Sequence, residues 1–285
     1  MGSGFSFLST PMDNSSTRRR RTPELGDLPE DCVAEVLSHL DPPEICRLAK
    51  LNLAFRGASS ADFVWESKLP ANYESIIHRV FESFPMSLCK KDIYGKLCRP
   101  IDIDGGTKRF WLDKVRGKAC LSISSQGLSI TGVDDRRYWN RISTNESRFG
   151  TIAYLQQTWW LEIEGEVEFP FPVGTYSVFV RLQLGQTTSN RFGRQTCNTQ
   201  HVHGWDKKPV QFKITTSSDQ PLVSQRFLGE TGKWVLHHCG DFVVEDCSKP
   251  VRVKFSMTQI DCTHTKGGLC VDSVLIYPSQ FRREG

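Results

Sequence analysis

The residue types best suited to metal chemistry are the cysteines and histidines in the second half of the chain. They fall into three closely spaced groups: Cys197, His201 and His203; His237, His238, Cys239 and Cys247; and Cys262, His264 and Cys270. Zinc usually takes four Cys or His ligands that come as two closely spaced pairs. The spacings C-x3-H-x-H and C-x-H-x5-C fit no standard zinc finger or ribbon. We therefore predict structural thiols and surface histidines, with no metal ion and no cofactor.

Motifs for catalysis are not found in the sequence. It contains no glycine-rich phosphate loop, no G-x-S-x-G elbow and no H-E-x-x-H helix. Among 10 cysteines and 7 histidines, nothing selects one pair as a nucleophile and its base. We expect a protein that binds other molecules and is not an enzyme.

The composition suits a folded protein with one large or two modest domains. The 285 residues are 38% hydrophobic, which is enough to fill a core. The net charge of +4 is small for this length, and no basic stripe with interleaved aromatic residues is seen, so we expect no nucleic acid partner. The one dense basic run, Arg18 to Arg21, is most often a solvated tail. Nuclear import and attachment to a membrane surface are the alternatives.

No apolar run approaches the ~20 residues that a membrane-spanning helix needs. The apolar patch from Phe5 to Leu8 is too short for the core of a signal peptide. We therefore expect reduced thiols and a location in the cytoplasm and the nucleus. The N-terminal residues MGSGFS match the short myristoylation template, so contact with a membrane surface is expected only if Gly2 is acylated.

Residues 24–70 show the pattern of three short amphipathic helices, preceded by a disordered arm at 1–23. In the first helix, Val33, Val36, Leu37 and Leu40 recur at i, i+3, i+4 and i+7. The Asp41-Pro42 pair can open a second helix, and a serine at 59 or 60 can cap a third. Helices this short cannot bury all their apolar side chains among themselves. Some of these side chains are expected to face another protein or the rest of the chain.

The order of an LP dipeptide, a DPPE turn and a D-F-V-W-E-S-K-L helix resembles an F-box. F-box modules dock onto the Skp-type adaptor of a cullin–RING ubiquitin ligase, so the resemblance implies these partners. The residues that match adaptor-facing positions are Leu28, Pro29, Val33, Val36, Leu37, Leu40, Ile45, Leu48, Val64 and Trp65. The expected mode of binding is helix-in-groove packing with aliphatic and aromatic anchors. An ordinary helical subdomain is the alternative.

Residues 71–103 keep a helical rhythm and are expected to form a helical linker. Asp104-Gly105-Gly106 then breaks the chain, and the period of the apolar pattern changes to two. Alternation predicts strands at 176–184, 210–215, 251–258 and 271–276, and a hairpin from Cys120 to Ile130 through the Gln126-Gly127 turn. The predicted fold is therefore a multidomain α+β chain whose helices precede an antiparallel β-sandwich of jelly-roll type at 104–280.

Three motifs in the second half carry a further resemblance. Tyr138-Trp139, Glu146-Ser147-Arg148-Phe149 and Trp160-Leu161-Glu162-Ile163 follow the YW…ESRF…WLEI order of the phloem protein 2 family. The chain also closes near a G-L-x-V-D-x-V-x-I-x-P strand like that of the family. Members of this family include lectins, and the combination with an F-box resembles the plant A-type F-box phloem protein 2 group.

The resemblance implies carbohydrate binding, which needs aromatic rings for the C–H faces of a sugar and polar groups for its hydroxyls. It places a ligand-contacting tryptophan at Trp139. Tyr138, Trp205 and Trp234, all near predicted loops, are further candidates. Packing in the core or in a hinge is the alternative for all four side chains.

Two other tryptophans and two departures from the family complete the prediction. Trp159 alternates in register with Leu161 and is predicted to be core, whereas Trp160 shares its face with Glu162 and is predicted to be partly exposed or sealed by a loop. Residues 232–242 lack most of the acidic residues that family lectins have there. The long polar loop at 186–206 is expected to cover or rebuild the cleft.

We therefore expect a non-catalytic substrate receptor. Its F-box would bind the adaptor and its C-terminal domain would hold a client protein, through glycans on that client. Tethering would raise the effective concentration of the client's lysines near the charged conjugating enzyme. A lectin without a ligase role and a receptor that recognises protein instead of sugar are the alternatives.

Overall fold

The computed structural model describes residues 28–85, 87–189, 195–216 and 220–283. The predicted arm at 1–23, with Gly2 and the basic run, lies outside the described residues. Within those described ranges, no helix is both long enough and apolar enough to cross a membrane.

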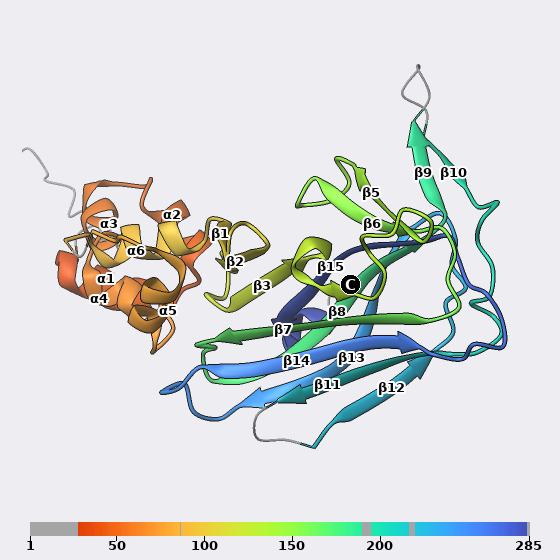
Figure 1. The fold of residues 1–285 in the computed structure, drawn as a ribbon. Coiled ribbons are helices and arrows are strands. Elements are labelled where there is room, and N and C mark those ends of the chain that lie inside the picture. Colours follow the sequence, from red (N-terminus) through yellow and green to blue (C-terminus); the bar gives the residue numbers. More distant parts are fainter. Residues whose placement is uncertain (1–27, 86, 190–194, 217–219, 284–285) are drawn as a thin grey trace, which may run out of the picture.

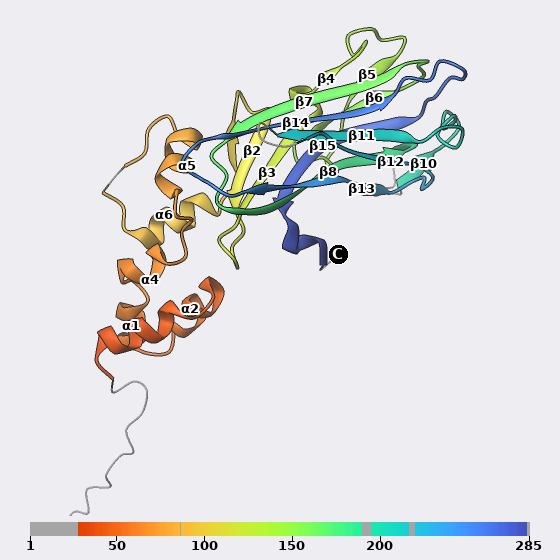
Figure 2. The ribbon, with the colours of Figure 1, turned by 90° about the horizontal axis from the view of Figure 1, so that it is seen from below.

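The N-terminal part is helical, and its helices gather at one end of the molecule (Figure 2). The α-helices of the described chain are α1 (Glu30–Ser38), α2 (Pro42–Leu48), α3 (Leu53–Ala58), α4 (Asp62–Glu66), α5 (Tyr73–Val80) and α6 (Lys90–Leu97). Residues 24–70 thus hold four helices where the sequence predicted three. The additional helix is α3, which begins after Asn52 because the Asn52 side chain accepts a hydrogen bond from the Phe55 N–H at 2.9 Å.

The rest of the chain is a curled antiparallel β-sheet domain (Figure 1). The strands are β1 (Ile101–Ile103), β2 (Lys108–Leu112), β3 (Ala119–Ser124), β4 (Ser129–Ile130), β5 (Trp139–Ser143), β6 (Thr151–Leu155), β7 (Leu161–Phe169), β8 (Gly174–Leu184), β9 (Gln186–Ser189), β10 (Gln195–Asn198), β11 (Val210–Thr216), β12 (Leu222–Arg226), β13 (Trp234–Val244), β14 (Val251–Gln259) and β15 (Leu269–Pro278).

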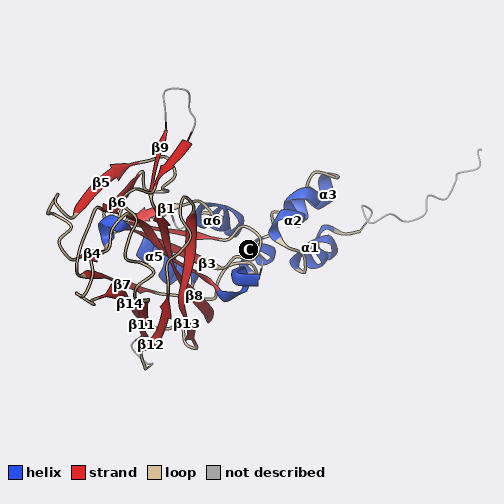
Figure 3. Ribbon diagram, turned by 90° about the vertical axis from the view of Figure 1, so that its right-hand side faces the viewer, coloured by secondary structure: helices blue, strands red, loops and turns tan. Residues whose placement is uncertain are grey.

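These strands form two large sheets and one hairpin. An eight-stranded sheet has the order β1-β2-β3-β15-β6-β5, and β8 joins it by pairing with β15 and β13. A five-stranded sheet has the order β12-β11-β14-β7-β4. The β9–β10 hairpin stands out from both sheets beside β5 (Figures 1 and 3).

The four strands predicted from the alternating apolar pattern are present in the structure as β8, β11, β14 and β15. Along β11 and β14 every second residue is buried, and these side chains join those of the eight-stranded sheet in one hydrophobic core. The predicted hairpin at 120–130 is wrong. The turn Ser125–Gly127 sends the chain to the other sheet, so β3 pairs with β2 and β15 whereas β4 pairs with β7. The jelly-roll-like sandwich stays a prediction.

The helical part and the sheet domain share the same hydrophobic core. Tyr94 of α6 packs its ring at 5.3 Å from that of Trp65, and its hydroxyl donates to the carbonyls of Asp113 and Lys114 beyond β2. Nearby, the Arg79 guanidinium of α5 lies 2.7 Å from the Asp104 carboxylate. The last three residues of the predicted linker form β1, which pairs with β2. These contacts fix the helices against the sheet domain.

Substitution of Gly117 should loosen this junction. Gly117 has φ +61°, and a Cβ there would meet the Lys68 carbonyl oxygen at 2.4 Å. Gly117→Ala should therefore lower the free energy of unfolding by at least about 2 kcal/mol, measured by chemical denaturation. The matched control is Gly95→Ala in α6, where no atom lies within 4 Å of the added Cβ. It should be neutral or raise stability by up to ~1 kcal/mol, and equal losses in both variants would contradict this account.

Candidate functional site

The F-box candidates divide into a core set and a surface set. Val33, Leu37, Ile45, Val64 and Trp65 are buried, and Leu40 and Leu48 are half-buried against them. The indole N–H of Trp65 donates to the Ser59 carbonyl at 2.7 Å, which ties α4 to the end of α3. In this conformation these residues hold the helices together. Leu28, Pro29 and Val36 are the exposed candidates.

Three further apolar residues of the helical part are exposed and lie outside the predicted set. Leu51, Leu53 and Phe63 are exposed, and Leu53 has 83% of its surface free. The sequence pattern missed them because they lie at helix starts and in a turn, outside the i, i+3, i+4 stripe. Large apolar side chains that stay exposed on short helices are candidates for contact with another protein.

A cleft lies on the outer face of the eight-stranded sheet, between β5–β6 and the β9–β10 hairpin. Its larger part encloses about 830 Å³ and its smaller part about 290 Å³, and the two parts share Ile142 and Gln186. The floor is a small apolar cluster of Ile142, Ile152, Tyr154, Cys270 and Trp234. Polar side chains line the rim: Asn140, Arg141, Thr144, Glu146, Gln156, Gln186, Asn198 and His201.

The floor of this cleft carries no charge at neutral pH. Burial raises the pKa of the Cys270 thiol to about 12 and the pKa of the Tyr154 hydroxyl above its usual value. Cys270 is therefore a neutral thiol and not an activated nucleophile. An apolar floor with hydrogen-bonding groups on its rim is the usual lining of a small-ligand site, so this cleft is the candidate functional site.

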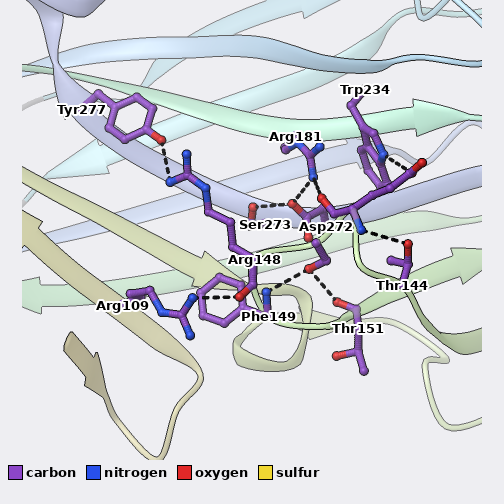
Figure 4. A network of polar contacts seen from close by, with 12 residues as sticks. Arg109, Thr144, Arg148, Phe149, Thr151, Arg181, Trp234, Asp272, Ser273 and Tyr277 are labelled. Carbon is purple, nitrogen blue, oxygen red and sulfur yellow. Dashed lines mark hydrogen bonds and ion pairs between the residues drawn. The ribbon is translucent and has the colours of Figure 1, made fainter. Parts of the chain in front are cut away.

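The Glu146-Ser147-Arg148-Phe149 motif lies in a network of polar contacts (Figure 4), and its first residue, Glu146, lines the smaller part of the cleft. Ser147 closes the loop on itself, since its hydroxyl donates to the Thr151 carbonyl and accepts from the Phe149 N–H. Arg148 donates to the Tyr277 hydroxyl at 3.2 Å. The Glu146 carboxylate accepts from the indole N–H of Trp234 at 2.8 Å. Through Glu146 and Arg148, the loop that carries this motif is therefore hydrogen-bonded to β13 and β15.

A buried ion pair supports this loop from below. Arg181 of β8 lies 2.7 Å from the Asp272 carboxylate of β15, and the same guanidinium donates to the Glu146 carbonyl at 2.9 Å. Asp272 is fully buried and sits where the register of β15 shifts. The Trp234 ring lies over the Arg181 guanidinium at 4.3 Å. The position of Trp234 thus depends on the ion pair.

The four aromatic residues predicted to bind sugar differ in how far they are buried. Trp139 lines the larger part of the cleft and Trp234 the smaller part. Trp139, however, is only 2% exposed and donates its indole N–H to the Thr131 carbonyl, which leaves no free ring face for stacking in this conformation. Trp205 is buried as well and donates to the Gly267 carbonyl at 2.7 Å. Tyr138 is exposed.

Two further tryptophans and the predicted polar loop complete the comparison. Trp159, predicted to be core, is 53% exposed because β7 begins only at Leu161, so that prediction is wrong. Trp160 is partly exposed as predicted. The polar loop contributes Gln186 and Asn198 to the cleft through the β9–β10 hairpin.

Several histidines of the three Cys and His groups make hydrogen bonds or ring contacts within the protein. Within the described parts of the chain, no three Cys, His, Asp or Glu side chains come together as a metal site. His238 lies 2.8 Å from the Asp241 carboxylate, and the ring of His237 stacks on Phe212. His264 is hydrogen-bonded to the Gly204 carbonyl.

The residues missed by the sequence reasoning include Arg181 and Asp272. A signal was available, because each places a charge in an otherwise apolar strand, and a buried charge requires a partner. Tyr154 was missed because T-I-A-Y-L does not show which of its faces is covered.

Removal of the buried carboxylate should destabilise the domain. Asp272→Asn leaves the Arg181 guanidinium without its negative partner, so the free energy of unfolding should fall by about 3 kcal/mol in chemical denaturation. The control is Arg252→Met, which breaks an exposed pair with Glu168 on β7 and should cost less than ~1 kcal/mol. A loss of similar size in both variants would show that the buried pair has no special role.

Comparison with known proteins identifies both parts of the chain. The F-box domain family matches residues 25–66, and the phloem protein 2 family matches residues 118–278. The chain is 56% identical to F-box protein PP2-A13 of Arabidopsis thaliana over 286 residues, which cover 100% of this chain and 98% of that protein. It is 55% identical to F-box protein PP2-A12 of the same plant, over 99% of this chain and 98% of that protein.

Solved structures resemble the sheet domain only distantly. A family 35 carbohydrate binding module from Clostridium thermocellum aligns at 13% identity and a TM-score of 0.32, over 56% of this chain and 98% of that one. The module TmCBM61 in complex with β-1,4-galactotriose aligns at 13% identity and a TM-score of 0.28, over 53% of this chain and 86% of that one. These similarities are too weak to assign a ligand.

Proposed function

The chain belongs to the family of plant F-box proteins with a C-terminal phloem protein 2 domain, and from this premise we propose that it is the substrate-recognition subunit of a cullin–RING ubiquitin ligase. The F-box docks the Skp-type adaptor, and the sheet domain binds a client protein through its glycans. Neither matched family is a family of enzymes, so the chain would act by holding the client near the conjugating enzyme.

The exposed apolar surface on the helices supports adaptor docking. Leu28, Val36, Leu51, Leu53 and Phe63 are exposed although they are large and apolar, while the residues behind them are buried in the chain's own core. Apolar anchors of this kind supply most of the binding energy when they enter the pockets of a partner. We propose that these five residues, with Pro29, contact the adaptor.

A charge placed on this surface should abolish adaptor capture. Val36→Glu puts a carboxylate into the contact, where it would lose its water without gaining a partner, so co-purification with the Skp-type adaptor should fall by about 30-fold or more. The exposure of Val36 predicts an unchanged melting temperature. Val243→Glu, at an exposed position of β13, is the control and should retain the adaptor. Full capture by Val36→Glu would refute this docking surface.

The cleft supports client recognition through glycans. Its rim offers amide and hydroxyl groups that can donate to and accept from sugar hydroxyls, and the half-buried Trp234 supplies an aromatic wall. The β9–β10 hairpin that forms one side of the cleft lies far from the helices, so a bound client would not obstruct the adaptor surface (Figure 1). The mixed polar and apolar lining is the observation that carries this part of the proposal.

Loss of a rim amide should weaken glycan binding. Asn140→Ala removes a donor and an acceptor from the larger part of the cleft, so the affinity for N-linked glycans on a printed array should fall by about tenfold. Gln225→Ala, on the exposed face of β12, is the matched control and should bind like the wild type. Equal binding by all three proteins would exclude the cleft. A wild-type protein that binds no glycan would point to recognition of bare protein surface.

A further inference from the structure

A hollow with a positive lining, which we call the basic groove, lies on the helical part of the chain beside α3. It encloses about 660 Å³, and three of its lining side chains are cationic: Lys50, Arg56 and Lys91. The remaining lining residues are neutral: Ala49, Asn52, Leu53, Ser59 and Ser60. Lys50 precedes α3 and Arg56 lies within it, whereas Lys91 comes from α6. The basic groove therefore extends beyond the residues matched by the F-box domain family, which end at 66.

The chain itself supplies no acidic partner for these cations. Across the described ranges of the chain, Lys50 and Arg56 form no ion pair, and the basic groove has no carboxylate in its lining. The Glu66 carboxylate of α4 pairs with Lys90 at 3.8 Å instead. A hollow lined by charges of one sign concentrates groups of the opposite sign. The basic groove therefore favours an anionic ligand.

The buried Trp65 side chain positions groups on two sides of the basic groove. Its indole N–H donates to the Ser59 carbonyl at the end of α3, at 2.7 Å, and the Lys91 ammonium of α6 lies 5.8 Å from the centre of its ring. The side-chain oxygen of Asn52 accepts from the Phe55 N–H, so the amide nitrogen of Asn52 can donate to a ligand. These contacts preorganise the lining, which reduces the entropy lost on binding.

The apolar part of the lining distinguishes between kinds of anion. Leu53 lines the basic groove with 83% of its surface free, and it also belongs to the apolar surface that we assign to the adaptor. An inorganic phosphate ion would leave this leucine in water. A peptide segment can present acidic side chains and an apolar side chain together, which covers the leucine and pairs the cations. The basic groove thus continues the proposed docking surface for the adaptor.

We propose that the basic groove receives an acidic segment of the Skp-type adaptor, whose carboxylates pair with Lys50, Arg56 and Lys91 while an apolar side chain covers Leu53. This inference rests on the proposed function, and it adds that α6, outside the F-box, takes part in docking. Charges at the edge of an interface act mainly on the association rate, because they steer the partner before contact. The dissociation rate is set by the buried apolar anchors instead.

The rate of adaptor binding tests these charges in the full chain. At low ionic strength, the double variant Lys50→Glu/Arg56→Glu should associate with the purified adaptor about tenfold more slowly than the wild type, with little change in the dissociation rate. Added salt should shrink this difference, since exposed charges are screened beyond about 10 Å at 0.1 M. Both side chains are exposed, which predicts an unchanged melting temperature.

The matched control is Lys207→Glu/Lys208→Glu. It makes the same change in net charge at two exposed positions just before β11, at the end of the sheet domain that points away from the helices (Figure 1). Its association rate should stay close to that of the wild type. A matching loss in this control would show that only the net charge of the chain matters, which would overturn the basic groove.

A zero-length cross-linker tests the same contact without any substitution. A carbodiimide joins a lysine amine directly to a carboxylate, so it links only groups that touch. In the wild-type complex, mass spectrometry should find Lys50 and Lys91 linked to Asp or Glu residues of the adaptor. Lys207 should give no link to the adaptor.

The outcomes separate the basic groove from adaptor docking itself. A wild-type association rate in Lys50→Glu/Arg56→Glu would overturn the basic groove, and so would a complex without cross-links from Lys50 and Lys91. In either case, loss of capture in Val36→Glu would still support docking through the apolar surface. A wild-type chain that does not bind the adaptor at all would overturn the proposed ligase role together with the basic groove.

Discussion

The buried pair of Arg181 and Asp272 is the interaction on which the candidate site depends. Two charges taken out of water are tolerated when they face each other closely, and removal of either partner is costly. Here the guanidinium meets the carboxylate and also binds the Glu146 carbonyl, so the loop from Thr144 to Gly150 is drawn onto the sheet (Figure 4). Trp234 then rests on the same guanidinium and donates to the Glu146 carboxylate. One ion pair between β8 and β15 thus helps to position both Glu146 and Trp234, which line the smaller part of the cleft.

The surfaces assigned to the adaptor and to the client lie at opposite ends of the molecule (Figure 2). In the described part of the junction, α5 and α6 share the hydrophobic core of the sheet domain and make direct contacts to it. A client held by the sheet domain would therefore keep a fixed orientation relative to the adaptor. In such an arrangement the choice of modified lysine depends on the shape of the receptor.

The sequence predicted those features that depend on local pattern. The amphipathic stripe located α1, and the alternation in 176–184, 210–215, 251–258 and 271–276 located four long strands. Alternation says which side chains share a face, but not which strand lies alongside. For this reason the segment from Cys120 to Ile130 was predicted as a hairpin, whereas its two strands belong to different sheets.

The aromatic residues show a second limit of sequence reasoning. Trp139 matches the position of a ligand-contacting residue in the family, yet it is buried in the hydrophobic core, where its indole N–H donates to the Thr131 carbonyl. Trp159 was placed in the core because it continues the register of β7, yet the strand starts two residues later and leaves it exposed. The alternating pattern predicts which side chains of a strand share a face. It does not predict where the strand begins, because that depends on the conformation of the preceding loop. That loop is fixed by Lys266, whose buried ammonium donates to the Trp159 carbonyl, which is distant in the chain, and to the nearer carbonyls of Gln259 and Asp261.

The shared core also bears on how such receptors diversify. A recombination event that replaced only the sheet domain would leave Arg79 and Tyr94 facing a surface to which they had never adapted. The smallest segment that could be inherited or exchanged intact therefore begins before α5, and the helices between the F-box and the sheets travel with the sheets. New client specificities are more readily acquired in the loops at the far end of the sheet domain, where substitutions leave this core untouched.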